Sequence, residues 1–163
     1  RGCYYEKCGF CTLYTAIGPT FRERSVERLV DDLKQLVALH DTPYFYFIMD
    51  DLPPLMAKRI PQAFSEAGLD VKWWCDARLE ERIFDHDTLH ALYGAGCRKL
   101  MFGFESGSQR LLDLVEKGTD ALAAGRCGGA PGRHDASRDL ARRLPCIVRS
   151  NRLSDRAGPY AGS

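Results

Sequence analysis

The sequence predicts an α/β fold built from parallel βα repeats. Up to about residue 120, short apolar runs alternate with amphipathic segments whose apolar residues recur at helical spacing. Glycines follow three of the helical segments, at positions where helices commonly end. Strands separated by helices of this length form parallel units with right-handed crossovers. The carboxyl ends of such strands share one edge of the sheet, where ligands bind.

The elements can be placed in order along the chain. A helix is predicted from Ser25, its N-cap, to His40. The run PYFYFIMDD, residues 43–51, predicts a buried strand because it is almost continuously aromatic and aliphatic. A helix over about 54–67 ends at Gly68. The later elements are a strand over 70–76, a helix from about 85 to Gly94 or Gly96, a strand over 98–106 and a helix over 108–118 closed by Gly118.

Composition indicates one ordinary globular domain. The chain has 163 residues, 45% of them hydrophobic and 28% charged, and a net charge of +1. This balance does not favour binding to nucleic acid or to an anionic membrane. No apolar run approaches the roughly 18 residues of a membrane helix, and no signal peptide is visible. We therefore expect a cytoplasmic protein with neither a membrane nor a nucleic-acid partner.

The character of the sequence changes at residue 120. Residues 121–163 contain eight Arg, no Lys, three Asp and no Glu, whereas residues 1–120 carry 15 basic and 19 acidic residues. Two interpretations stay open: a disordered Arg-rich tail, or the product of a GC-rich gene read in the wrong frame. We favour the second. The division predicted is thus a core over 1–120 and a tail over 121–163. The start at Arg1, without a methionine, predicts a fragment of a longer protein.

Three cysteines crowd the first eleven residues, RGCYYEKCGFC. Cys3, Cys8 and Cys11 could form a metal site, a disulfide framework or buried thiols. An odd total of seven cysteines argues against a disulfide scaffold. A structural zinc site needs four ligands, and Cys75 and Cys97 lie where burial as small apolar residues is expected. Three thiolates on one loop suit an iron–sulfur cubane with one iron left open.

Polar residues stand at the carboxyl end of each predicted strand. They are Asp50 and Asp51, then Asp76 and Arg78, then Glu105 and Ser106. Because parallel strands end at one edge of the sheet, these side chains should converge with the cysteine loop. The pattern predicts a binding site at that edge.

The cysteine loop, with Phe10 just before the last cysteine, resembles the signature loop of the radical S-adenosylmethionine superfamily. The strings FIMDD and GFESGSQRLLDLVEKGT resemble strand motifs of its cobalamin-associated and related branches. The resemblance covers about residues 1–119. Four residues rather than three separate the first two cysteines, and Met49, Asp50 and Asp51 replace the usual Gly-Gly-Glu. The family's first strand and its fifth and sixth units have no counterpart.

The resemblance implies a fold and cofactors. The fold would be part of a partial (β/α)6 TIM-like barrel, incomplete at both ends. Cys3, Cys8 and Cys11 would hold three irons of a [4Fe–4S] cluster, and S-adenosylmethionine would bind the fourth. Reduction by a donor such as flavodoxin or ferredoxin would then yield a 5′-deoxyadenosyl radical that abstracts hydrogen from an unknown substrate. Cobalamin would be a further cofactor in this branch, and whether a domain that binds it precedes Arg1 stays open.

The resemblance also suggests cofactor contacts, each with a plainer alternative. Phe10 would pack near the adenine, or simply pack within the loop. Asp50 would accept from the cofactor's ammonium group, whereas we expect Asp51 to cap the helix that begins near Pro53. Glu105 would accept from the ribose hydroxyls, or pair with a nearby Arg.

Ser106 would support the cofactor or cap the helix that follows it. Arg78 would pair with the cofactor carboxylate, or form a salt bridge within the protein. Trp73 and Trp74 should divide between the barrel interior and the helix-packed face. His86 and His90, four residues apart, lack a further ligand and should lie on the surface. The competing function is a non-catalytic zinc- or cluster-binding module, and the substrate stays open.

Overall fold

The described part of the chain forms a three-stranded parallel sheet. The structure is a computed structural model that describes residues 1–18, 20–80 and 82–122. Its strands, in the order β1–β2–β3, are β1 (Tyr44–Phe47), β2 (Lys72–Ala77) and β3 (Cys97–Phe102). Both neighbouring pairs are parallel, as the sequence predicts. The fold is therefore α/β, with each strand joined to the next through a helix.

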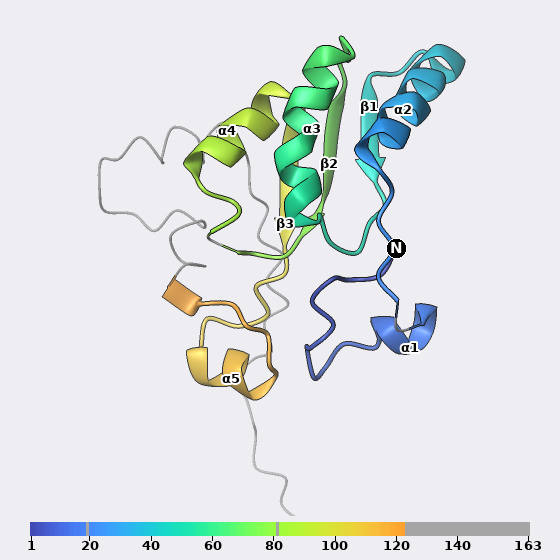
Figure 1. Cartoon of the computed structure of the whole chain (residues 1–163). Coiled ribbons are helices and arrows are strands. Elements are labelled where there is room, and N and C mark those ends of the chain that lie inside the picture. The colour runs from blue at the N-terminus through green and yellow to red at the C-terminus, as the bar shows by residue number, and fades with distance from the viewer. Residues whose placement is uncertain (19, 81, 123–163) are drawn as a thin grey trace, which may run out of the picture.

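The helices divide into two groups. Helices α2 (Val26–His40), α3 (Pro54–Glu66) and α4 (His86–Gly94) cover one face of the sheet (Figure 1). The short helices α1 (Leu13–Ile17) and α5 (Gln109–Leu114) lie beyond the carboxyl ends of the strands, beside the N-terminal loop (Figure 1). Helix α1 was not predicted, and α5 is shorter than the predicted 108–118.

The helix ends follow local rules of capping. The Ser25 hydroxyl accepts a hydrogen bond from the backbone N–H of Arg28 at 3.2 Å, which confirms the predicted N-cap of α2. Gly68 has a φ of +62°, and the N–H of Leu69 donates to the carbonyl of Phe64 at 3.0 Å. This closes α3 with a left-handed glycine, as expected.

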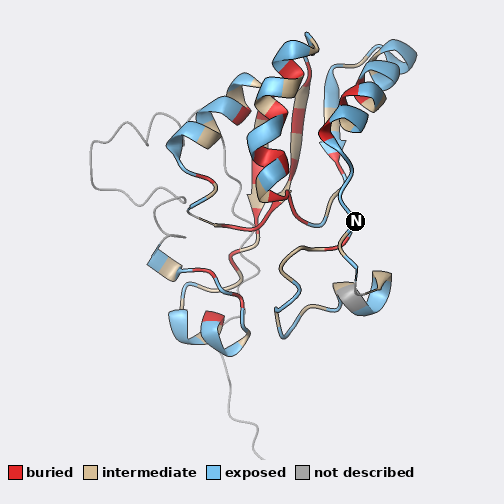
Figure 2. Ribbon diagram, viewed as in Figure 1, coloured by how far each residue is buried: buried red, intermediate tan, exposed pale blue. Residues whose placement is uncertain are grey.

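The core lies between the sheet and helices α2–α4, where the buried residues gather in Figure 2. Trp73 is 0% exposed and stacks on Phe47, with ring centroids 4.8 Å apart. Its indole N–H donates to the carbonyl of Ala95 at 2.9 Å, so its polar atom is satisfied. Cys75 and Cys97 are fully buried in the same cluster, which confirms that they pack as small apolar residues.

The opposite face of the sheet is more open. Trp74 is only partly buried there and stacks on Tyr46, with centroids 6.0 Å apart. The two tryptophans thus divide between the two faces, as predicted. The prediction of a strand within 43–51 is confirmed, but its length and its burial were wrong: β1 ends at Phe47, and Ile48 is 92% exposed. The burial of β1 alternates, because Phe45 and Phe47 face the core whereas Tyr44 and Tyr46 lie exposed on the open face of the sheet.

The predicted tail cannot be compared with the fold, because residues 123–163 lie outside the described residues. The division at residue 120 therefore stays a prediction. Within the described part of the chain, no helix has the length and apolar character needed to cross a membrane.

Candidate functional site

The cysteine loop, residues 1–11, begins beside the carboxyl end of β1. The N–H of Gly2 donates to Asp50 Oδ2 at 2.9 Å, and the carbonyl of Arg1 accepts from the N–H of Arg22 at 2.9 Å. Gly2 has a φ of +87°, and a Cβ at this position would lie 2.8 Å from the Thr20 carbonyl oxygen. Only glycine fits this close approach of two backbones. Asp50 thereby fixes the entry of the loop.

Asp51 connects the first cysteine to the end of β2. Its Oδ1 accepts from the N–H of Arg78 at 2.6 Å, and its Oδ2 lies 3.5 Å from Cys3 Sγ. Burial raises the pKa of Asp51 to about 6. The predicted cap was wrong, because Pro53 is the N-cap residue of α3 and makes no side-chain capping bond. The carboxylate turns instead toward the neighbouring strand, where a backbone donor is available.

Arg78 is a buried guanidinium with several protein partners. It is 6% exposed and donates to Glu80 Oε1 at 3.1 Å and to the carbonyls of Lys117 and Gly118. Its Cζ lies 3.5 Å from the centroid of the Tyr5 ring, a cation–π contact. The structure shows the alternative reading of Arg78, an ion-paired residue. Its pairing with a cofactor carboxylate stays a prediction.

Two tyrosines of the loop bind to distant segments. The Tyr4 hydroxyl donates to Glu80 Oε1 at 2.6 Å, and burial together with this bond raises the pKa of Tyr4. The Tyr5 hydroxyl donates to the carbonyl of Glu116 at 2.9 Å. Sequence reasoning missed these anchors, although two adjacent tyrosines between Cys3 and Cys8 were a visible signal.

Residues 115–118, which follow α5, form a docking segment for the loop. The N–H of Gly9 donates to the carbonyl of Val115 at 2.9 Å. Lys117 Nζ lies 3.1 Å from Glu105 Oε1 and 5.6 Å from the centroid of the Phe10 ring. Gly118, with a φ of +63°, packs against Tyr5 so closely that a Cβ would reach the Tyr5 hydroxyl. The sequence indicated Gly118 only as a helix end.

Three more residues that were predicted to contact a cofactor have different local settings in the structure. Phe10 is 48% exposed beside Lys117. Glu105 has a φ of +61°, an unusual conformation for a non-glycine residue. The Ser106 hydroxyl accepts from the N–H of Ser108 at 3.1 Å, which shapes the turn before α5. Glu105 is thus paired with Lys117, whereas the sequence had suggested an Arg as its partner within the protein.

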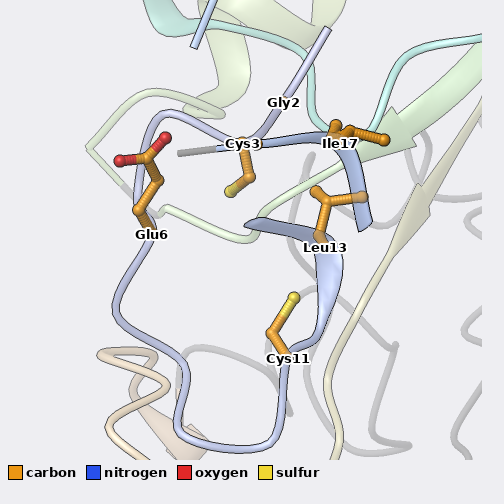
Figure 3. A pocket seen from close by; sticks show the side chains of 7 residues that line it. Gly2, Cys3, Glu6, Cys11, Leu13 and Ile17 are labelled. Atoms are coloured by element: carbon orange, nitrogen blue, oxygen red, sulfur yellow. The ribbon is translucent and has the colours of Figure 1, made fainter. Parts of the chain in front are cut away.

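The cysteine thiols are half-buried, and none of them forms a disulfide. Figure 3 shows Cys3 and Cys11 directed into one small pocket, which Gly2, Glu6, Leu13 and Ile17 also line. Burial raises the pKa of Cys3, and the adjacent Asp51 adds to this effect. Burial also raises the pKa of Cys8, but the positive charges of Lys117 and Arg78 oppose it.

The arrangement of the possible ligand residues bears on whether they could hold zinc or an iron–sulfur cluster. Among the described residues, no group of three or more His, Cys, Asp or Glu is arranged to hold a metal ion. The absence of such a group supports neither a structural zinc site nor a metal site at His86 and His90, which are exposed on α4. A cubane presents its irons at separate corners, so its ligands do not have to meet at one point. Three free thiols on one loop, with cations beside them, have the donor chemistry that such a cluster needs.

A groove of about 840 Å³ lies beside the loop, at the carboxyl ends of β1 and β2. Its lining includes Arg1, Phe21, Tyr46, Asp50 and Asp76. The Tyr46 hydroxyl donates to Asp76 Oδ2 at 2.5 Å. The volume falls in the range of small-molecule sites. The predicted convergence of the strand-end carboxylates is confirmed for Asp50, Asp51 and Asp76.

Comparison with known proteins shows what the chain is similar to. No family model matches the chain. An uncharacterised methyltransferase of Pyrococcus horikoshii is 32% identical over 121 residues, which are 72% of this chain and 26% of that protein. The cobalamin-dependent S-adenosylmethionine radical enzyme OxsB matches with a TM-score of 0.65 at 22% identity, over 92% of this chain and 22% of OxsB.

The radical S-adenosylmethionine methyltransferase TsrM of Kitasatospora setae, solved with cobalamin and a [4Fe–4S] cluster, matches with a TM-score of 0.62. The identity is 16%, over 87% of this chain and 27% of TsrM. This chain therefore shares its fold with two cobalamin-associated radical S-adenosylmethionine enzymes. It spans about a quarter of the length of these three proteins. The resemblance predicted from the cysteine loop is confirmed.

Proposed function

We propose that this chain forms part of a radical S-adenosylmethionine enzyme that holds a [4Fe–4S] cluster through Cys3, Cys8 and Cys11. One observation carries the proposal: three half-buried free thiols lie on a loop fixed at the carboxyl ends of parallel strands. The three strands would belong to a partial (β/α)6 TIM-like barrel. The likeness in fold to OxsB and TsrM supports that arrangement.

The bound groups would supply the difficult chemistry, namely reductive cleavage of the sulfonium to a 5′-deoxyadenosyl radical that removes hydrogen from a substrate. The chain's own residues hold and orient. Asp51, buried against Cys3, fixes the first ligand, and the turn in which Cys11 N–H donates to the Cys8 carbonyl at 3.0 Å fixes the other two.

S-adenosylmethionine would lie between the loop and the strand ends. Asp50, in the groove, is the proposed acceptor for its ammonium group, and Glu105 is the proposed acceptor for its ribose hydroxyls. The half-exposed ring of Phe10 would pack near the adenine, with Ser106 shaping the adjacent turn. Arg78 is already bonded to three protein groups, so we propose that it acts on the cofactor site mainly by holding Tyr5 and the docking segment.

We propose methyl transfer as the reaction class, because the relative from P. horikoshii and TsrM are both named methyltransferases. A cobalamin would then carry the methyl group, held by a part of the protein outside this chain. The electron would come from a small carrier such as flavodoxin or ferredoxin, in a cytoplasmic setting. The proposal names no substrate, because the names of the relatives refer to different substrates.

Metal analysis tests the proposal. The chain would be reconstituted anaerobically with iron and sulfide, and its iron, acid-labile sulfide and zinc measured beside those of Cys8→Ala and Cys75→Ala. We expect about four iron and four sulfide per chain. These should be lost in Cys8→Ala and kept in Cys75→Ala, because Cys75 is buried in the core. Zinc uptake, or a folded chain that takes up no cluster, would contradict the proposal.

A second readout separates a structural cluster from a catalytic one. S-adenosylmethionine added to the reduced, reconstituted chain should change the electron paramagnetic resonance spectrum, because the cofactor would bind the iron that no cysteine holds. An unchanged spectrum at saturating cofactor would instead favour a cluster that only stabilises structure.

A further inference from the structure

Two buried cations face the aromatic residues of the cysteine loop. Arg78 is 6% exposed and lies against Tyr5, and Lys117 is 8% exposed and lies over Phe10. Side chains of these types are rarely so buried unless they are paired. Each has a carboxylate partner, Glu80 for Arg78 and Glu105 for Lys117. The loop therefore sits among charges that the protein has taken out of water.

The two cations are held differently. The guanidinium of Arg78 bonds to two backbone carbonyls as well as to Glu80, so its charge is spread over contacts that fasten the docking segment. The ammonium of Lys117 is held by one carboxylate oxygen, from Glu105, and by the face of the Phe10 ring, which belongs to the cysteine loop. An ammonium is a compact charge, and its field acts over a short distance with little screening when it is buried.

Lys117 lies beside the part of the loop that joins Cys8 to Cys11. The N–H of Gly9 donates to the carbonyl of Val115 at 2.9 Å, and Lys117 Nζ lies 5.6 Å from the centroid of the Phe10 ring. Gly9 and Phe10 are the two residues between Cys8 and Cys11, so the buried ammonium is held next to this segment.

We propose that Lys117 is a positioning residue that raises the reduction potential of the iron–sulfur cluster by presenting a buried positive charge beside the loop segment between Cys8 and Cys11. This inference rests on the proposed function. Reduction adds one electron to the cluster and makes it more negative, so a fixed cation beside one ligand stabilises the reduced state. The site then becomes easier to reduce for a carrier of modest potential.

The test compares four variants of the full chain, each reconstituted with iron and sulfide and titrated with dithionite, which supplies the electron. Lys117→Met removes the charge, and Lys117→Arg keeps it. Glu105→Gln removes the opposing carboxylate. Lys7→Met is the matched control, because Lys7 lies on the same loop, 5.9 Å from the Tyr5 ring centroid, but is exposed. The readout is the midpoint potential without S-adenosylmethionine, so that cofactor binding does not enter.

The expected shifts have opposite signs. Lys117→Met should lower the midpoint potential. At a fixed potential, the ratio of reduced to oxidised cluster should fall at least tenfold, which corresponds to a shift of about 59 mV for a one-electron couple. Glu105→Gln should raise the potential, Lys117→Arg should restore most of the wild-type value, and Lys7→Met should leave it unchanged. A purely structural lysine would alter cluster content without this pattern of signs.

The other outcomes distinguish failure of the role proposed for Lys117 from failure of the proposed cluster. If Lys117→Met and Glu105→Gln both retain the wild-type potential, or shift it in the same direction, the electrostatic role of Lys117 is refuted and the cluster stands. If Lys117→Met holds no cluster, the Glu105→Gln and Lys117→Arg potentials still decide the question. If the wild-type chain takes up no cluster, the proposed function fails and the inference fails with it.

Discussion

The fit between Gly118 and Tyr5 gives a sharp prediction about how the loop is held. Gly118→Ala places a methyl group on a residue with a φ of +63°, which costs about 1–2 kcal/mol for the backbone alone. The new Cβ would also lie 2.1 Å from the Tyr5 hydroxyl oxygen, so the ring must move. Moving it breaks the bond to the Glu116 carbonyl, worth about 1 kcal/mol, and the contact with Arg78, worth about 1 kcal/mol.

The total predicted loss is about 3–4 kcal/mol in the free energy of unfolding, measured by urea denaturation. Gly68→Ala is the matched control, because Gly68 has a φ of +62° and nothing lies within 4 Å of its Cβ position. It should lose only the backbone term of about 1–2 kcal/mol. Tyr5→Leu in the Gly118→Ala background should recover part of the difference. Equal losses in the two glycine variants would refute the idea that Gly118 is selected by its contact with Tyr5.

Three further predictions follow from the same structure. Trp73→Ala should destabilise the chain by about 3–5 kcal/mol in urea, because the ring is fully buried, while the half-buried Trp74→Ala should cost clearly less. Asp76→Asn should lower the pKa of Tyr46 from about 12 toward 10, seen in a tyrosinate absorbance titration against Tyr46→Phe, because the phenol donates to that carboxylate. Iodoacetamide should modify Cys8 well before Cys75, since burial raises the pKa of Cys75 far above 9, and equal rates in peptide mapping would contradict this.

The features that sequence predicted well are those set by neighbouring residues. The cap at Ser25 and the left-handed stop at Gly68 depend on a few adjacent side chains and backbone torsions, and both are present. The alternation of strands and helices also follows from local periodicity. The buried position of Cys75 follows from its place in an apolar strand.

The features that sequence did not predict depend on neighbours across the sheet. Asp51 stands two residues before Pro53 and so resembles a capping residue, but the free N–H of Arg78 at the end of the adjacent strand attracts its carboxylate. Tyr46 lies in an apolar run that suggested burial, yet its side chain is on the open face of the sheet. Lys117 directly precedes Gly118, which the sequence indicated only as the end of a helix. Only the folded loop shows that the charge of Lys117 faces Phe10.

The way the cysteine loop is held indicates which parts of the chain the site depends on. The N–H of Gly2, the hydroxyl of Tyr4 and the N–H of Gly9 bond to residues that follow β1, β2 and α5, respectively. Three successive βα units thus each fix one point of a loop that is only eleven residues long. Residues 1–11 contain no helix or strand, so the position of Cys3 relative to Cys8 depends on these anchors, whereas a local turn joins Cys8 to Cys11. The arrangement of the three thiols therefore depends on the correct pairing of the strands whose ends anchor the loop.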